Sequence, residues 1–296
     1  MLKLSPAHLL LVVVAAIWGS GFVAQRLGMA TLGPYSFNAA RFVLATLALL
    51  PVWWYMRSRQ SKPQPAGGKL FWWGSLLAGS VMFAGFSFQQ VGLQYTTAGN
   101  AGFITSMYIV LVPLIGLALG ERTRIHIWLG IVLAVLGLYK LSVGPNFHIN
   151  RGDWLELMGA FFWAAHVVTL GWLSRRVTDV VGVSVVQFAV AACWGIAATL
   201  LLESPTVPDF SAAALPLLYS GLIVSGLAFS LQIMAQRTVD ASMAALILSG
   251  EAVFALLAGW FFLGEQVGSK ELVGCGLMLA GMLISQWPEN PNPNQR

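Results

Sequence analysis

Charge is what this sequence has least of. Only 9% of its 296 residues are Asp, Glu, Lys or Arg, whereas 57% are hydrophobic, and a soluble globular protein carries about 25% charged residues. So few charges cannot keep a water-soluble protein of this size dispersed, and the apolar side chains must therefore face lipid. The net charge of +5 does not indicate nucleic-acid binding, because the basic residues stand in short segments between apolar runs.

Cysteines and catalytic motifs are also scarce. Cys193 and Cys275 lie inside apolar runs without metal-ligand spacing, and a buried free cysteine behaves as a small hydrophobic side chain. The sequence contains no HExxH motif, no Gly-rich phosphate loop and no soluble catalytic domain. We therefore expect no metal, no cofactor and no ATP-driven step, so a gradient of substrate or of protons has to drive any transport.

Long apolar runs are abundant, and about 20 mostly apolar residues suffice to cross a bilayer as a helix. Charged or turn-forming residues separate ten such runs, and several of the connections are so short that the helices must form antiparallel hairpins. The predicted spans are residues 7–27, 35–56, 70–93, 99–119, 125–143, 153–174, 180–202, 212–236, 241–264 and 268–287. The apolar run after Lys3 is interpreted as an uncleaved first span, and residues 288–296 as a disordered tail.

The basic residues orient these spans. With the N-terminus inside, eleven Lys and Arg residues fall on the inner side and four on the outer side, while Arg41 lies within a span. Cytoplasmic loops carry the excess of positive charge in membrane proteins. We therefore predict a multi-pass protein of the bacterial inner membrane with both termini and the tail in the cytoplasm.

The chain also repeats itself. A shift of 144 residues places Leu119-Gly120-Glu121 on Leu263-Gly264-Glu265, and a shift of 145 places Trp18 on Trp163. These matches indicate a duplication, with a first five-helix repeat at 1–143 and a second at 144–287. Because five is odd, the second copy enters the membrane from the opposite side. The predicted fold is an all-α membrane protein whose two inverted five-helix repeats surround a central cavity, a common plan of secondary transporters.

At this point the sequence resembles the EamA-like branch of the drug/metabolite transporter superfamily over nearly its whole length. The resemblance rests on AIWGS at 16–20, Pro34, RFVLA at 41–45, LQYTTAGNAGFI at 93–104, Pro113, GER at 120–122, AALILSGEAVF at 244–254 and LGE at 263–265. It implies ten helices in two inverted halves, a central cavity, and export of amino acids, related metabolites or drugs. The family often has Pro after the ninth-span Glu, whereas Ala252 follows Glu251 here, so we expect a straighter helix.

Glu251 is the most informative polar residue, because it lies near the middle of an apolar span. An unpaired carboxylate there costs at least about 2.5 kcal/mol. One interpretation is that Glu251 faces the cavity and binds a substrate amine or a coupling proton. The other is that it is a structural carboxyl, hydrogen-bonded to another helix, for example through Asn100. Arg41 also has two interpretations. It could bind a substrate carboxylate, or it could have a structural role.

Further polar and aromatic residues could line the cavity. Asn100 and Tyr108 are eight residues apart and would share one face of a continuous helix, as would Glu156 and Trp163, with His166 one turn beyond. The predicted substrate-binding residues are Trp18, Gln90, Asn100, Tyr108, Trp163, His166, Gln232, Ser249 and Glu251. Alternatively, the tryptophans are packing anchors and glutamines such as Gln89 join neighbouring helices.

Two small-residue pairs predict close helix contacts, Gly116 with Gly120 and Gly276 with Ala280, and we expect these contacts to be intramolecular. The predicted function is that of a secondary transporter exporting amino acids or related small metabolites by alternating access. A proton-coupled multidrug or cation exporter is the alternative, ahead of a membrane-embedded enzyme or a channel. The expected partners are a small-molecule substrate, the lipid bilayer and protons, with the protein a monomer or weak dimer.

Overall fold

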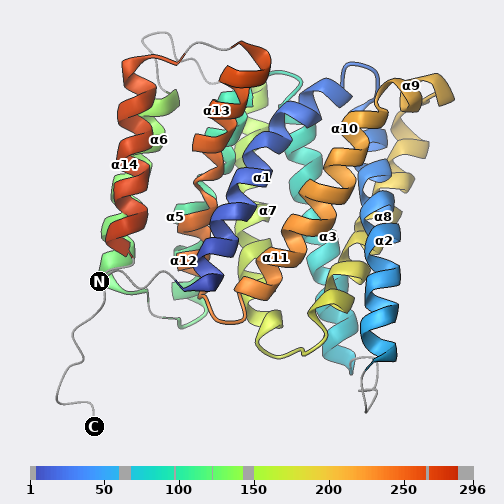
Figure 1. Cartoon of the computed structure of the whole chain (residues 1–296), viewed down its shortest axis with the longest axis horizontal. Helices are drawn as coiled ribbons and strands as arrows, with labels where there is room; N and C mark the ends of the chain where they lie inside the picture. The colour runs from blue at the N-terminus through green and yellow to red at the C-terminus, as the bar shows by residue number, and fades with distance from the viewer. Residues whose placement is uncertain are drawn as a thin grey trace.

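The computed structural model describes residues 5–59, 68–96, 98–121, 123–142, 150–264 and 267–285. Every regular element within these ranges is a helix, and the helices pack side by side into one elongated bundle (Figure 1). The predicted all-α fold is confirmed. The predicted tail at 288–296 lies outside the described residues.

The first half of the chain supplies five apolar spans. They are α1 (Pro6–Gly28), α2 (Pro34–Ser58), α3 (Lys69–Gly92), the pair α4 (Ala98–Thr105) and α5 (Tyr108–Ala118), and α6 (Ile125–Ser142). α1 and α2 each begin with Pro, whose missing N–H is no loss in the first turn of a helix.

The second half repeats this order. It contains α7 (Arg151–Ser174), α8 (Val180–Leu202), α10 (Ala214–Leu218) continued by η1 (Tyr219–Leu227) and α11 (Ala228–Ala235), α12 (Ala241–Leu248) with α13 (Glu251–Leu263), and α14 (Ser269–Ser285). A short helix, α9 (Val207–Ala212), precedes α10. Eight helical segments of the described chain are long and apolar enough to span a membrane, and Ile125–Lys140 and Leu272–Ser285 add two shorter ones. Ten spans in two five-helix repeats are therefore present, as predicted.

Each repeat contains one span that is broken in the middle. α4 ends at Thr105 and α5 begins at Tyr108, while α12 ends at Leu248 and α13 begins at Glu251. At the second break, the N–H groups of Gly250 and Ala252 donate to carbonyls only three residues back, which tightens the backbone. The expectation of a straighter helix at Glu251 is therefore wrong. The Ser249-Gly250 pair breaks the span without proline, since both residues are weaker helix formers than alanine.

Two further predictions about these spans are corrected by the structure. The break at Ser106 and Met107 separates Asn100 from Tyr108, so spacing on a continuous helix does not relate them. Neither small-residue pair brings helices together at its glycines. A Cβ added at Gly116 would meet only Glu121, three residues beyond the end of its own helix, and one added at Gly120 or Gly276 would meet nothing within 4 Å.

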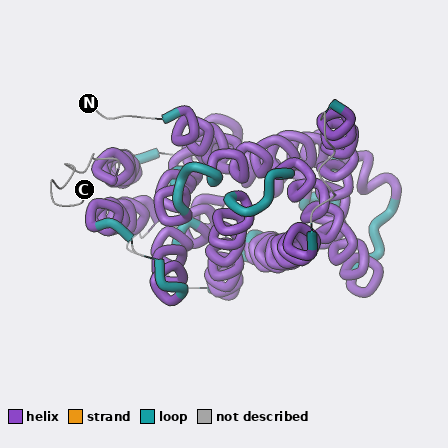
Figure 2. Tube along the Cα trace, turned by 90° about the horizontal axis from the view of Figure 1, so that it is seen from below, coloured by secondary structure: helices purple, strands orange, loops and turns teal. Residues whose placement is uncertain are grey.

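Helices from the two repeats pair at both ends of the bundle. α6 and α14 stand side by side at one end, on the left in Figures 1 and 2, and α2 and α8 pack together at the opposite end. Between them, α1 packs on α13 as α7 packs on α4 and α5. The first two contacts join equivalent helices, and the α1–α13 contact is equivalent to that of α7 with α4 and α5, so the two repeats build one central core together.

The α6–α14 contact brings two backbones very close together. A Cβ on Gly130 would lie 2.6 Å from the carbonyl oxygen of Gly281, and a Cβ on Gly281 would lie 2.5 Å from that of Gly130. Only glycine fits at such distances, which is how small residues drive helix association in lipid. A shift of 144 residues places Gly130 on Gly274 and Gly137 on Gly281, so the signal for this pairing lies at glycines that the two repeats share and not at the GxxxG motif.

The α2–α8 pair is fastened at both of its ends. The carboxylate of Glu203, just after α8, accepts hydrogen bonds from the backbone N–H groups of Tyr35 and Ser36 at 2.9 and 2.8 Å. At the other end, the indole of Trp53 donates to Asp179 at 2.7 Å, and Asp179 also caps α8. These bonds satisfy helix ends that lipid cannot solvate.

Candidate functional site

A small cavity of about 30 Å³ lies where the two repeats meet. Its walls come from α1, α3, α4, α5, α7, η1, α11 and α13, so both repeats contribute. The lining residues are Trp18, Phe22, Gln25, Phe86, Gln89, Thr105, Tyr108, Trp163, Val167, Val224, Phe229 and Glu251. Four of the nine predicted substrate-binding residues are among them, namely Trp18, Tyr108, Trp163 and Glu251.

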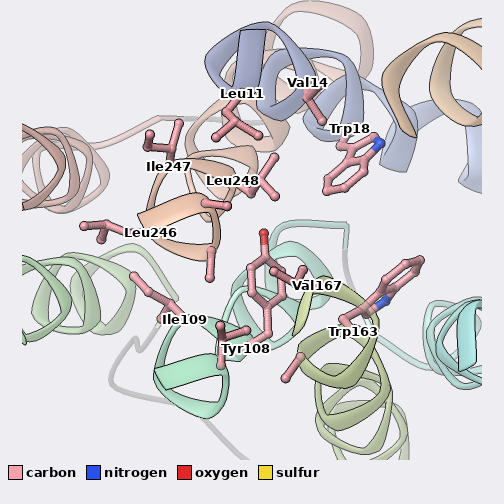
Figure 3. Packing of buried hydrophobic residues seen from close by; sticks show 14 of the residues in the cluster. Leu11, Val14, Trp18, Tyr108, Ile109, Trp163, Val167, Leu246, Ile247 and Leu248 are labelled. Carbon is pink, nitrogen blue, oxygen red and sulfur yellow. The ribbon is translucent and has the colours of Figure 1, made fainter. Parts of the chain in front are cut away.

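Two tryptophans in equivalent positions of the repeats form the centre of the aromatic wall. Trp18 on α1 and Trp163 on α7 have ring centroids 6.5 Å apart, and Figure 3 shows them projecting into the same space beside Tyr108. Phe229 packs 4.6 Å from Trp18, and Phe86 meets Trp163 edge-on at 4.6 Å. These contacts fix the rings, so the wall presents rigid aromatic faces.

The two indoles differ in their hydrogen bonds. Trp18 donates its Nε1–H to the carbonyl oxygen of Val224 in η1, at 3.2 Å. The Nε1 atom of Trp163 is buried and has no hydrogen-bonding partner among the described residues. A buried indole N–H usually finds an acceptor, so Trp163 offers a free donor to a molecule in the cavity.

Glu251 supplies a carboxyl group to the cavity lining. It is the first residue of α13 and only 4% exposed, and its Oε1 atom has no hydrogen-bonding partner in the described chain. Tyr108, the first residue of α5, lies close enough to interact with it. Each broken span therefore places the first residue after its break at the centre, one a carboxyl and the other a phenol.

The position of Glu251 depends on how closely α1 approaches α13. A Cβ on Gly19 would lie 2.6 Å from the carbonyl oxygen of Glu251. Gly19 follows Trp18 directly, so the same turn of α1 that presents the tryptophan also allows the backbone of Glu251 to come near. This explains why the two residues share one cavity.

Sequence reasoning missed several lining residues. Gln25 lies two turns beyond Trp18 on α1, and Thr105 lies three residues before Tyr108, so helical spacing could have found Gln25. Phe229 and Val224 had no such signal, because η1 alters the register of its span.

Other predicted residues lie outside the lining. Gln90, His166, Gln232 and Ser249 are all completely buried, but none lines the cavity. His166 bonds Gln187 at 3.1 Å, and the Ser249 hydroxyl donates to the carbonyl oxygen of Leu246 at 2.7 Å. Gln89, not Gln90, reaches the cavity. The side chain of Asn100 is outside the described part of the structure.

Arg41 is buried behind the cavity wall. Its guanidinium lies 4.2 Å from the ring centroid of Phe86, and its Nε donates to the Ser225 hydroxyl at 3.1 Å. Phe86 lines the cavity and Arg41 does not, so the positive charge is separated from the cavity by an aromatic ring.

Comparison with known proteins identifies the family of this chain. Residues 5–143 and 150–286 each match the EamA-like transporter family. The chain belongs to the EamA-like transporter family. An uncharacterized transporter of Archaeoglobus fulgidus is 34% identical over 94% of this chain and 85% of its own length. The uncharacterized inner membrane transporter YedA of Escherichia coli is 24% identical, over 90% of this chain and 86% of its own.

A solved crystal structure shares the EamA-like architecture. It superposes with a TM-score of 0.76 and 17% sequence identity, covering 95% of this chain and 98% of the other. At that identity the likeness concerns the fold. The protein is therefore a multi-pass membrane transporter of the drug/metabolite transporter superfamily, which takes a small-molecule substrate. The family is one of transporters and not of enzymes, so the membrane-embedded enzyme is set aside.

Proposed function

We propose that the protein is a secondary transporter that exports amino acids or related small metabolites by alternating access. The observation that carries this proposal is the central cavity with Glu251 at its middle, enclosed by helices of both repeats. Substrate sites of inverted-repeat transporters lie near the midplane, at discontinuous helices. The breaks before Tyr108 and Glu251 correspond to that description.

The chemistry of the cavity supports a substrate with an ammonium group and an apolar body. In this conformation the cavity, of about 30 Å³, is smaller than the range of about 300–1,000 Å³ typical of small-molecule sites, so it has to widen to admit the substrate. Glu251 can pair with an ammonium group, and the faces of Trp18 and Trp163 can attract it as well. The free N–H of Trp163 can donate to a carboxylate.

One observation favours the alternative, a proton-coupled exporter of organic cations or drugs. The described lining residues include the carboxyl of Glu251 and no Lys or Arg, while Arg41 is shielded by Phe86. A cation without a carboxylate would therefore find as many partners as an amino acid. In either case Glu251 is the proposed proton carrier, as well as a substrate contact.

Alternating access requires that the cavity close on one side while it opens on the other. The spans begin and end at two opposite faces of the bundle. We name the face where α1 begins the α1 side, and the face where α7 begins the α7 side. Lining residues Phe22 and Gln25 near the end of α1, and Gln89 near the end of α3, extend the cavity toward the α7 side. On the α1 side it is closed by apolar residues that are at most 1% exposed, namely Leu11, Val14, Ile109, Val112, Ile247 and Leu248 (Figure 3).

We further propose that the protein lies in a bacterial inner membrane with its α1 side facing the cytoplasm. The described basic residues at the α1 side are Arg57, Arg59, Lys69, Arg124, Arg175, Arg176 and Arg237, and those at the α7 side are Arg26, Lys140, Arg151 and Lys270. Seven against four follows the positive-inside rule. In this orientation both termini are cytoplasmic and the cavity extends outward.

Cysteine labelling tests this orientation. In a chain with Cys193 and Cys275 replaced, a cysteine at Val207, which is 79% exposed on the α7 side, should react with a membrane-impermeant maleimide added to whole cells. A cysteine at Arg176, exposed on the α1 side, should react only after the cells are opened. The reverse pattern would overturn the orientation, and labelling of both from outside would overturn the topology.

Flux measurements test the function. Amino acids, their decarboxylated amines and quaternary ammonium dyes are screened for a rise in the melting temperature of the purified protein, and the binders are then loaded into proteoliposomes. We expect at least one amino acid or related amine to bind and to leave these vesicles faster than protein-free ones. Transport of dyes alone would establish the alternative, and no transport of any compound would contradict both.

Trp163→Ala tests whether the substrate binds in this cavity. Removing an aromatic face from a cation site should weaken binding about tenfold, equivalent to about 1.4 kcal/mol. Trp194→Ala is the control, because Trp194 is 51% exposed on the outside of the bundle. Equal effects of the two substitutions would argue against substrate binding in this cavity.

A further inference from the structure

A second carboxyl, Glu156 on α7, is buried next to the cavity. Its side chain is completely buried, although it lies only five residues after the start of α7 at Arg151. One oxygen, Oε2, accepts a hydrogen bond from the Thr105 hydroxyl at 3.0 Å. The other, Oε1, is buried with no hydrogen-bonding partner among the described residues. Helix capping therefore does not explain this carboxyl.

The groups around Glu156 provide no neutralising cation. From its own helix Asp153 faces it, and from α13 Glu251 does, each interacting with it electrostatically. α3 presents Gly92, where an added Cβ would lie 2.9 Å from Oε1 of Glu156. α4 presents Thr105, which also accepts from the amide of Gln89 at 3.2 Å, so neither helix brings a charge.

Two further titratable groups of the described chain near this cluster do not change that balance. Tyr108 at the start of α5 interacts with Glu251 and is neutral in its ordinary state. Arg151, at the first position of α7, is exposed and lies over the ring of Tyr95 at 5.2 Å. Two carboxyls in one apolar environment, with no buried cation between them, cannot both ionise without a large cost.

The polar groups form a line from the α7 side to the middle of the bundle. Asp153 is in the first turn of α7, where it caps the helix with Asn150 and accepts from the Thr96 hydroxyl at 2.7 Å. Glu156 is one turn deeper, and Thr105 leads from it to the cavity in which Glu251 stands. The described residues named above that close the α1 side are apolar, so the polar route traced here runs from the α7 side.

We propose that Glu156 and Glu251 form a coupled pair of proton-binding carboxyls, in which Glu156 takes up the proton from the α7 side and Glu251 holds it at the centre. The pair then shares protons as a unit, and the ionisation of either carboxyl depends on the other. This inference rests on the proposed proton coupling at Glu251 and adds a second site to it. No covalent chemistry is involved, because the proton moves between two carboxyl oxygens and leaves a carboxylate behind.

Infrared spectroscopy of the full-length protein in lipid tests the pair, with the proton itself as the probe. Protonated carboxyls in an apolar environment give a C=O stretching band that disappears on ionisation. We expect two such bands to titrate with pH, one missing from Glu156→Gln and the other from Glu251→Gln. In Glu251→Gln the Glu156 band should disappear at a pH lower by at least about one unit, because the neighbouring negative charge is gone.

Two further variants serve as controls for the infrared experiment. Asp209→Asn, which alters a partly exposed carboxyl on α9, far from the cavity, should change neither band. Glu156→Asp keeps the carboxyl and serves if Glu156→Gln does not fold, since its band should shift rather than vanish. A Glu156 band that never titrates, or that titrates at the same pH with and without Glu251, would overturn the pair.

The same spectra separate this inference from the proposed function. If the Glu251 band titrates and the Glu156 band does not, only the second site is refuted. If Glu251 itself stays protonated at every pH, proton coupling at Glu251 fails and the pair fails with it. Substrate flux in proteoliposomes is measured independently of both outcomes.

Discussion

Glu251→Gln is expected to keep substrate exchange at equal pH, with weaker binding because the carboxylate contact is lost, and to remove the response of exchange to a pH gradient. Glutamine keeps the size and the hydrogen-bonding capacity of the side chain, so the 4%-exposed site should still fold. It cannot take up or release a proton, however. In proteoliposomes holding a substrate identified by the screen, exchange at equal pH should therefore persist, while uphill accumulation driven by a pH gradient should fall to the level of protein-free vesicles.

Glu121→Gln is the matched control for that experiment, because Glu121 is an exposed carboxyl on the loop after α5. It should transport like the parent protein. If Glu251→Gln still concentrates substrate at the expense of protons, Glu251 is a structural carboxyl. If it loses binding altogether while remaining folded, the carboxylate is mainly a substrate contact and the proton-carrier role falls.

Much of the fold follows from the sequence, because the bilayer imposes simple rules. Each span must satisfy its own backbone hydrogen bonds, so apolar length and interrupting charges define the helices. The seventh helix of the structure, α7, runs from Arg151 to Ser174, against a predicted span of 153–174. Inversion of the repeats follows from an odd number of spans, which no packing detail can alter.

The breaks in the fourth and ninth spans could not be placed from sequence. Proline is the signal usually sought, yet the break before Glu251 lies at Ser249-Gly250 and the one before Tyr108 at Ser106-Met107. Glycine and serine occur in many continuous membrane helices. Here the breaks persist because the two tightened segments meet, with the Ser106 hydroxyl 3.4 Å from the carbonyl oxygen of Ser249.

The candidate site was predictable only where symmetry or charge marked it. Trp18 and Trp163 stand out through the repeat, and Glu251 through its charge in an apolar run. By contrast, Gln89 and Gln90 are neighbours pointing about 100° apart, and only the packing of α3 decides that Gln89 faces the cavity. Glu156 lies near a helix start, so its complete burial depends on how closely α3 approaches α7.

The two repeats also contribute different side chains to the site. Equivalent helices supply equivalent tryptophans, but the first residues after the breaks are Tyr108 and Glu251. The charge therefore belongs to one repeat. In the proposed mechanism, the symmetric walls would serve the movement of the helices, and the asymmetric carboxyls would determine which ions and substrates couple to it.

Gly281→Leu is expected to have the largest effect on stability. A Cβ at this position would lie 2.5 Å from the carbonyl oxygen of Gly130 and 3.2 Å from the backbone nitrogen of Ala134. Backbone atoms cannot move aside as a side chain can, so α14 would have to separate from α6. Overpacking of a close contact costs about 1–3 kcal/mol and occasionally more, and here we expect about 3 kcal/mol or more, measured as a large fall in the melting temperature of the purified protein.

Gly276→Leu on the same helix is the control, because Gly276 is exposed and an added Cβ would meet nothing within 4 Å. A leucine there faces lipid and should leave the melting temperature unchanged. The comparison cancels helix propensity, since both variants place leucine for glycine in α14. Equal melting temperatures would mean that α6 and α14 do not depend on this contact, and the pairing of the two repeats would then have to rest on α2 with α8 and on the helices around the cavity.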